Sequence, residues 1–234
     1  MGTVRERRVE RSVATALALS ACGVAFERAG PSVLGAPPEE LARWVRAHRA
    51  ALCAQSGFFI ASTVPLLTFF AALQERLDAG RSPRPPCRLR GRAVLDAGTL
   101  WLACNAGAQL VQVRMALSAH DPAPVVAHRS DLMRRTLAVG NLPLVAALAT
   151  TAVEGRRTAA LAPSVTALSA ATALLHLVPL AGFAGRRGRS VADGPGAYLP
   201  YPAFVAWLVA VAATAHRRRR SGLPGADRDP AHDR

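Results

Sequence analysis

The stretch AALCAQSGFFIASTVPLLTFFAAL, residues 50–73, has no charged side chain and decides the fold class. A helix that crosses the hydrocarbon core of a bilayer needs about 20 apolar residues, each adding about 1.5 Å of rise. This stretch is long enough without help from its neighbours. Further apolar runs occur along the chain, and Arg-rich segments separate them. The sequence therefore predicts an all-α, integral membrane helical bundle with about six transmembrane helices.

The composition of the 234 residues agrees with this class, because charged residues make up only 19% and gather between uncharged runs. The net charge of +14 comes from Arg, since the chain has no Lys. Such an excess is typical of proteins that bind nucleic acid or anionic lipid, and it also sets membrane topology. Because the Arg residues flank apolar runs, we expect contact with anionic headgroups and no nucleic-acid partner.

The predicted spans cover residues 12–26, 50–73, 93–117, 136–153, 160–182 and 197–215. Before the second span, PPEELARWVRAHR (residues 37–49) predicts a short helix at the outer membrane surface, with Trp44 at headgroup level. In the last span, Tyr198, Tyr201 and Trp207 indicate a helix anchored at the membrane interface. Between spans we expect an irregular positive loop over residues 74–92, a solvated loop from His120 to Asp131, and a tight turn from Glu154 to Arg157. Residues 221–234 are expected to be a disordered tail.

The first apolar run, residues 12–26, allows three interpretations. It is a short transmembrane helix, a secretory signal, or a lipoprotein signal whose Leu19-Ser20-Ala21-Cys22 resembles a processing box. Each interpretation places the following residues on the outer side. With the N-terminus inside, 18 of the 29 Arg residues fall on the inner side, which predicts a multi-pass protein of the cytoplasmic membrane with both termini in the cytoplasm.

Three longer segments carry a resemblance to a known family. They are PPEELARWVRAHR leading into a span that ends LLTFFAALQERL, then SDLMRRTLAVGNLPLVAALATTAVEGRRTAALAP, and the closing YPAFVAWLVAVAATAHRRRR. The pattern, over residues 31–220, resembles a family of uncharacterised multi-pass membrane proteins, a domain of unknown function typical of high-GC bacteria. The resemblance implies a compact helical bundle in the cytoplasmic membrane, and it supplies no activity or cofactor. The sequence departs from that layout at Glu27-Arg28, which end the first run early.

Polar side chains gather near the outer ends of five predicted spans. They are Gln55, Asn105, Gln109, Gln112, Asn141, His176 and Tyr201. The three on the third span follow i, i+4, i+7 spacing and so share one face. One hypothesis is that they line a ligand-binding pocket open to the outside. The other is that they hydrogen-bond between helices, an interaction that averages about 0.6 kcal/mol in membrane bundles. The sequence leaves both open.

No catalytic or metal-binding motif is found in the sequence. It lacks HExxH, GxSxG and a Gly-Lys phosphate loop, and its cysteines (Cys22, Cys53, Cys87 and Cys104) form no CxxC pair. Around His120, the side chains of Asp121, His128 and Asp131 are expected to be solvated and not to bind a metal. We therefore expect no enzyme and no cofactor. The prediction is a non-catalytic accessory, sensing or lipid-interacting membrane protein, with a membrane protein as partner; the alternative is a small-solute carrier or binding protein.

Overall fold

The structure is a computed structural model that describes residues 2–27, 36–80, 92–118, 120–184 and 200–220. Its described part contains six helices and no strand, which confirms the predicted all-α class and the helical bundle. The helices are α1 (Gly2–Ala25), α2 (Pro38–Ala79), α3 (Ala93–Leu117), α4 (Ala123–Arg157), α5 (Pro163–Ala184) and α6 (Pro200–Arg220).

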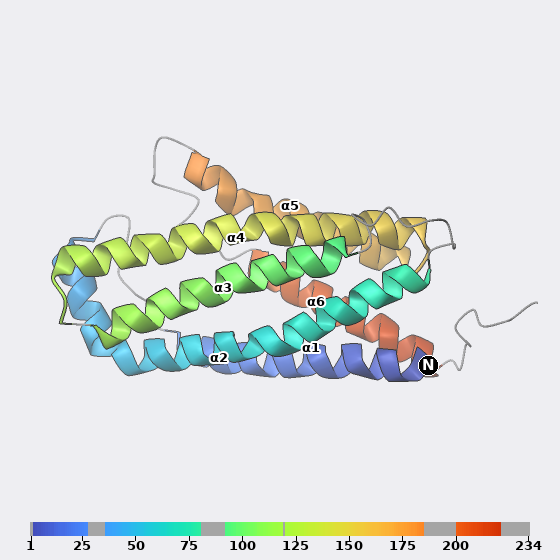
Figure 1. The fold of residues 1–234 in the computed structure, drawn as a ribbon, viewed down its shortest axis with the longest axis horizontal. Coiled ribbons are helices and arrows are strands. Elements are labelled where there is room, and N and C mark those ends of the chain that lie inside the picture. Colours follow the sequence, from blue (N-terminus) through green and yellow to red (C-terminus); the bar gives the residue numbers. More distant parts are fainter. Residues whose placement is uncertain (1, 28–35, 81–91, 119, 185–199, 221–234) are drawn as a thin grey trace, which may run out of the picture.

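The helices form a closed ring in chain order. Each helix packs against the next one along the chain, and α6 packs back against α1, while α2 also contacts α4. Figure 1 shows the helices lying side by side, with the N-terminus of α1 and the C-terminus of α6 at the same end. We call this end, which also holds the C-termini of α2 and α4, the basal end, and the opposite end the distal end. Successive helices run in opposite directions (Figure 1).

The predicted bounds hold for α3, whereas α2 is longer than predicted. The surface helix expected over residues 37–49 and the span over 50–73 belong to one helix of 42 residues, which continues to Ala79. Figure 1 shows its first turns inclined to the rest. The last six residues of α2, from Gln74, were expected in an irregular loop. They remain helical because the prolines that forbid a helix begin only at Pro83, and residues 81–91 lie outside the described part.

The prediction of a loop from His120 to Asp131 is wrong from Ala123 onward, where α4 begins. Proline is compatible with a first helical turn, whose N–H groups have no helical acceptor, and Pro124 stands there. Arg129 Nη1 lies 2.7 Å from Asp121 Oδ2 and ties the first turns of α4 to the residues before them. Most of the segment predicted to be a solvated loop, residues 123–131, therefore belongs to α4.

The other bounds shift by smaller amounts. The Arg-rich start of the chain is helical from Gly2, and the expected turn at Glu154 to Arg157 is the last turn of α4. The connection to α5 lies at residues 158–162, where Ala159 adopts a left-handed φ of 50°. The predicted tail and residues 197–199 of the sixth span lie outside the described residues, as do Cys87 and Tyr198.

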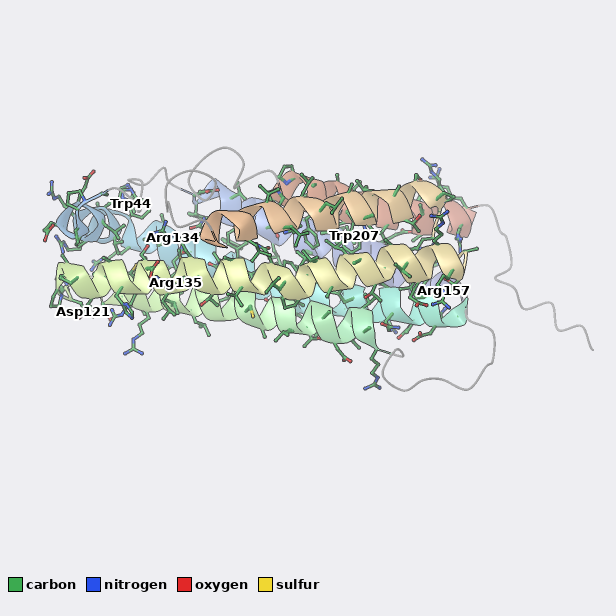
Figure 2. The ribbon with its side chains drawn as sticks, turned by 90° about the horizontal axis from the view of Figure 1, so that it is seen from above. Trp44, Asp121, Arg134, Arg135, Arg157 and Trp207 are labelled. Carbon is green, nitrogen blue, oxygen red and sulfur yellow. The ribbon has the colours of Figure 1, made fainter. Side chains whose placement is uncertain are left out.

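The main core lies toward the basal end and is built on aromatic rings. Phe69, Phe70 and Trp207 are fully buried, with the ring centroids of Phe69 and Trp207 5.4 Å apart. The rings of Trp101 and Phe204 lie 5.1 Å apart beside them. Trp207 was expected at the membrane interface, which is wrong: it packs inside the bundle (Figure 2) and its Nε1–H donates to Ser169 Oγ at 2.8 Å. An indole can be buried this way once its one donor has an acceptor.

A second, smaller core occupies the distal end. Its members are Leu41, Ala42, Val45 and Leu52 of α2, Met115 and Ala116 of α3, and Val126 of α4. The apolar face predicted to lie on the membrane surface therefore packs against protein instead. Trp44 is half-buried beside this cluster and stacks on His48, with ring centroids 4.9 Å apart.

By length and composition, two helices of the described part, α2 and α4, contain a run apolar enough to cross a membrane. Two such helices are weak evidence by themselves, because a core helix of a water-soluble protein passes the same test.

Candidate functional site

The predicted polar layer contains two hydrogen-bonded pairs on different helices. In the first pair, Gln112 of α3 donates through Nε2 to Gln55 Oε1 of α2 at 2.9 Å, and the same amide lies 3.5 Å from the carbonyl oxygen of Leu52. Gln112 is buried and Gln55 half-buried. This pair joins two neighbouring helices of the ring, as the hypothesis of interhelical hydrogen bonds requires.

The second pair joins α4 to α5. His176 Nδ1 lies 3.1 Å from Asn141 Oδ1, and the imidazole meets the ring of Phe204 edge-on at 6.2 Å. Because an amide oxygen only accepts, the proton of this hydrogen bond belongs to Nδ1. In a neutral imidazole, Nε2 then carries a lone pair. That atom is buried and has no hydrogen-bond partner in the described part of the chain.

Two further polar atoms near these pairs are buried without a hydrogen-bond partner among the described residues. They are Gln109 Oε1 on α3 and Ser56 Oγ on α2. Most buried polar groups in folded proteins are hydrogen-bonded, so such atoms indicate a bound water or ligand, or a stability cost that the fold tolerates. Gln109 Oε1 and His176 Nε2 are both acceptors, so whatever satisfies either of them must supply a donor.

The remaining two residues of the predicted layer are placed differently. Asn105 is half-buried on α3 and has no side-chain hydrogen bond in the described part. Tyr201 stands 44% exposed at the start of α6, where its side chain lies beside Ser20 of α1. Four of the seven predicted residues therefore form two pairs, and Tyr201 contacts α1. The other two, Asn105 and Gln109, have no side-chain hydrogen bond to any residue that the structure describes, so the structure brings the seven together only in part.

The basal end contains polar residues that the sequence interpretation missed. Gln74 Oε1 accepts from the backbone N–H groups of Val94 and Leu95, at 3.1 and 3.4 Å, and so caps the first turn of α3. A helix start leaves its first N–H groups unsatisfied, and a side chain from another helix here supplies the acceptor. In the sequence, Gln74 directly follows the uncharged run of residues 50–73, where a loop was expected to begin. Because α2 continues through Gln74, this side chain is instead held on a helix, where it can reach α3.

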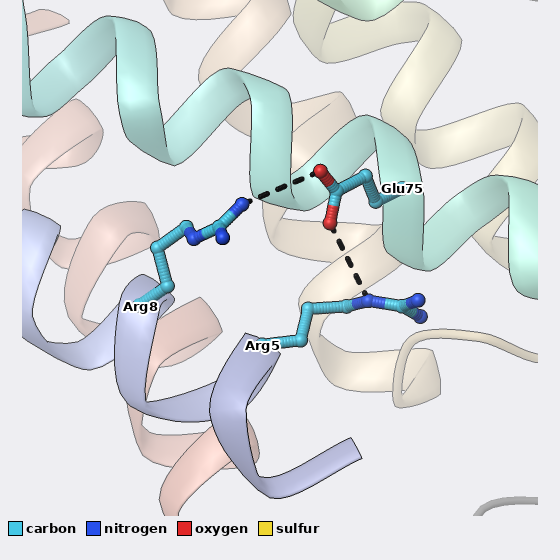
Figure 3. A network of polar contacts seen from close by, with 3 residues as sticks. All are labelled: Arg5, Arg8 and Glu75. Atoms are coloured by element: carbon cyan, nitrogen blue, oxygen red, sulfur yellow. Dashed lines mark hydrogen bonds and ion pairs between the residues drawn. The ribbon is translucent and has the colours of Figure 1, made fainter. Parts of the chain in front are cut away.

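Ion pairs fasten α1 at the same end. Figure 3 shows Glu75 of α2 between two arginines of α1, with Arg5 Nε at 3.5 Å and Arg8 Nη1 at 3.4 Å. His216 of α6 lies 3.5 Å from Glu10 of α1. These pairs are partly exposed, so each contributes little energy. Val9 and Val13 of α1 are buried in the main core.

An open groove of about 350 Å³ lies at the basal end between α3 and α4. Its lining residues are Ala93, Ala149, Thr150, Val153, Glu154 and Arg157. Arg157 Nη1 lies 3.6 Å from Glu154 Oε1 at its rim. The groove is apart from the two polar pairs, which lie on the distal half of the bundle. Among the described residues, no three His, Cys, Asp or Glu side chains are grouped so that they could hold a metal ion.

Comparison of the chain with models of protein families, with curated proteins and with solved structures finds no match. The resemblance to a family of high-GC bacteria therefore stays a prediction.

Proposed function

We propose that this chain is an integral protein of the cytoplasmic membrane whose six helices all cross the bilayer, and that it has a non-catalytic accessory, sensing or lipid-interacting role. The observation that carries the proposal is the apolar outer face of the ring. Large hydrophobic side chains stand exposed along the middle of the helices. They include Val64 and Leu67 of α2, Leu100 and Leu110 of α3, Val139, Leu142 and Val153 of α4, Leu174 of α5, and Val209 of α6.

Such a surface suits lipid and not water. Extensive exposed apolar patches on a protein mark contact with another protein or with a membrane. Here exposed large hydrophobic side chains occur on all six helices, since α1 adds Val4 and Val24, which favours a surrounding apolar solvent over a single docking face. The sides of these helices are also free of charge over long runs, with no charged residue from 50 to 74, from 97 to 113 or from 136 to 153.

At the basal end, the charged residues of neighbouring helices begin at a similar height along the bundle, and this also supports the membrane proposal. Contacts join Glu75 of α2 to Arg8 of α1, His216 of α6 to Glu10 of α1, and Gln74 to the first turn of α3. Each of these residues lies within about one helical turn of the boundary of an uncharged run. A common boundary across neighbouring helices is what a membrane surface imposes.

The most apolar stretch of α3 is less apolar than those of α2 and α4, and the inward-facing polar side chains of α3 explain how it could still cross a membrane. Its amides Gln109 and Gln112 are only 7% exposed, so they face protein and not the surroundings of the bundle. A polar side chain on an inward face lowers the average hydropathy of a span without meeting lipid, and intramembrane polar residues usually point this way. The excess of Arg on the basal side supports cytoplasmic termini.

Membrane insertion and topology can be tested together. In a chain with its four cysteines replaced by Ser, single cysteines are introduced as His120→Cys at the distal end or Arg156→Cys at the basal end, both exposed positions. We expect the protein to stay in the membrane after alkaline carbonate extraction. A membrane-impermeant maleimide should label the His120→Cys chain in intact cells, and the Arg156→Cys chain only after lysis. Recovery in the soluble fraction, or labelling of both from one side, would contradict the proposal.

A second candidate function is binding or transport of a small solute, and the unpartnered atoms of the distal half favour it. Gln109 Oε1 and His176 Nε2 are acceptors in need of donors, so the matching solute carries N–H or O–H groups. Solute-dependent uptake that is lost in Asn141→Leu and His176→Leu, with protein levels unchanged, would select this function. Copurification of a defined membrane protein with uptake unaffected would select the accessory role.

A further inference from the structure

Arg76, in the last turns of α2, is a charged side chain buried at the basal end. It is 8% exposed, and its Nε donates to the carbonyl oxygen of Ala160, in the connection between α4 and α5, at 3.2 Å. Both terminal nitrogens, Nη1 and Nη2, are buried without a hydrogen-bond partner in the described part. A buried guanidinium with four unsatisfied N–H groups is costly for a fold unless something pairs with it.

The charges around Arg76 make this cost larger. Burial and the positive charge of Arg218 on α6 lower the pKa of Arg76 to about 10, and the negative charge of Glu6 on α1 opposes them. The neighbouring acids on its own helix have other partners, because Glu75 meets Arg5 and Arg8 (Figure 3) and Asp78 accepts from Gln74 at 3.0 Å. Arg76 thus has the charge of a second cation, Arg218, acting on it, and only the charge of Glu6 opposes that repulsion.

We infer that Arg76 and Arg218 form a binding site for a phosphate group at the basal end of the bundle. The two free Nη groups of a guanidinium present parallel N–H donors that match two oxygens of a phosphate, and a second Arg beside them adds charge that a phosphate can neutralise. The phosphate comes from a lipid headgroup or from a soluble phosphate. The lipid source rests on the proposed membrane placement, whereas the soluble source does not.

The connection that Arg76 contacts lies close against the end of α2. A Cβ atom on Gly80, just after α2, would come within 3.0 Å of the Thr158 carbonyl oxygen, so only glycine allows this close approach. Because the Nη atoms are covered in the structure, an anion reaches them when nearby side chains move aside. The phosphate then ties α2, α6 and the α4–α5 connection together, and its binding should stabilise the whole bundle.

The test is the thermal unfolding of the full chain in a phosphate-free detergent, with three additions. These are sodium phosphate against sodium chloride at equal ionic strength, phosphatidylglycerol in mixed micelles, and a phosphate-free anionic lipid such as a fatty acid. At about 100 times Kd, binding should raise Tm by roughly 5 to 10 °C. A rise with sodium phosphate assigns a soluble ligand, and a rise only with phosphatidylglycerol assigns a headgroup.

Variants decide whether Arg76 is responsible. Arg76→Gln should lose the rise in Tm, Arg76→Lys should keep a reduced one because it retains charge without the paired donors, and Arg218→Gln should weaken binding. Arg156→Gln, an exposed Arg at the same end, is the matched control and should keep the full rise. If Arg76→Gln fails to fold, Arg76→Lys and Arg218→Gln carry the test. The inference is overturned if no phosphate source raises Tm of the parent, if the fatty acid does so equally, or if these variants respond like the parent.

Failure of this site is distinguishable from failure of the membrane proposal. Carbonate extraction and maleimide labelling report the placement of the helices, while phosphate binding in detergent reports the site whatever the placement.

Discussion

The basal and distal halves of the bundle hold their helices together in different ways. In the basal half, aromatic rings of α2, α3 and α6 fill the centre, and Gln74 satisfies backbone N–H groups of another helix. In the distal half, side chains pair with side chains, as in Gln55 with Gln112 and Asn141 with His176. Both halves contain buried polar atoms without a hydrogen-bond partner among the described residues, such as Arg76 Nη1 in the basal half and Gln109 Oε1 in the distal half. The backbone N–H groups of Val94 and Leu95 are present whatever their side chains, so they always need an acceptor such as Gln74. Side-chain partners such as Gln55 and Gln112 can both be replaced by leucine, which leaves no group unsatisfied. The packing of the basal half is thus the more constrained, and the polar contacts of the distal half are the easier ones to test by substitution.

The largest effect that would sharpen this comparison is expected at Trp207. Trp207→Ala removes a fully buried ring that packs on Phe69 and Phe204, so it should lower the stability by about 3 to 5 kcal/mol. The melting temperature in mild detergent should fall by roughly 6 to 20 °C. Val209→Ala, on the same helix but 47% exposed, is the control and should change little. Equal small shifts for both would mean that the basal half has no special core.

Two glycines on α3, Gly98 in the basal half and Gly107 toward the distal half, allow the packing of the two halves to be compared within one helix. A Cβ on Gly98 would lie 2.6 Å from Phe70 Cγ, whereas a Cβ on Gly107 would meet nothing within 4 Å. Gly98→Ala should therefore cost about 1 to 3 kcal/mol by forcing a buried ring to move. Gly107→Ala should be neutral or gain up to about 1 kcal/mol, because alanine favours a helix. Thermal unfolding checks both, and a stabilising Gly98→Ala would show that the basal packing is loose.

The smallest effects are expected in the distal half, and their signs matter more than their sizes. Asn141→Leu and His176→Leu each break a hydrogen bond between α4 and α5 and should destabilise by about 0.6 kcal/mol. Gln109→Leu removes an unpartnered buried oxygen and should leave stability unchanged or raise it.

Melting curves against an exposed control, Ala146→Leu, test this difference. If all three leucine variants are as stable as the parent or more so, the polar groups were kept at a cost to stability and a ligand role gains support. If all three destabilise beyond the control, the residues serve helix packing alone.

The candidate site was predictable to the extent that helical spacing could reveal it. The spacing of Gln109 and Gln112 on one face agrees with the burial of both side chains. Which partners they find could not be predicted, because a pair such as Gln55 and Gln112 depends on the rotation and height of two helices. The basal residues Gln74 and Arg76 were missed because polar residues after an uncharged run resemble the start of a loop, and only their contacts with α3 and Ala160 give them roles.

The sequence alone determined that this chain is a bundle of about six helices, since six mostly uncharged runs follow one another with charged or Pro-containing segments between them. Only the tertiary structure decided which side of each helix faces inward. In most globular proteins the contrast between apolar and polar faces reveals this, but here exposed and buried faces are both apolar, as Val209 and Trp207 on α6 show. When both faces carry the same kind of side chain, the choice between them is made by the shapes that pack together in the core.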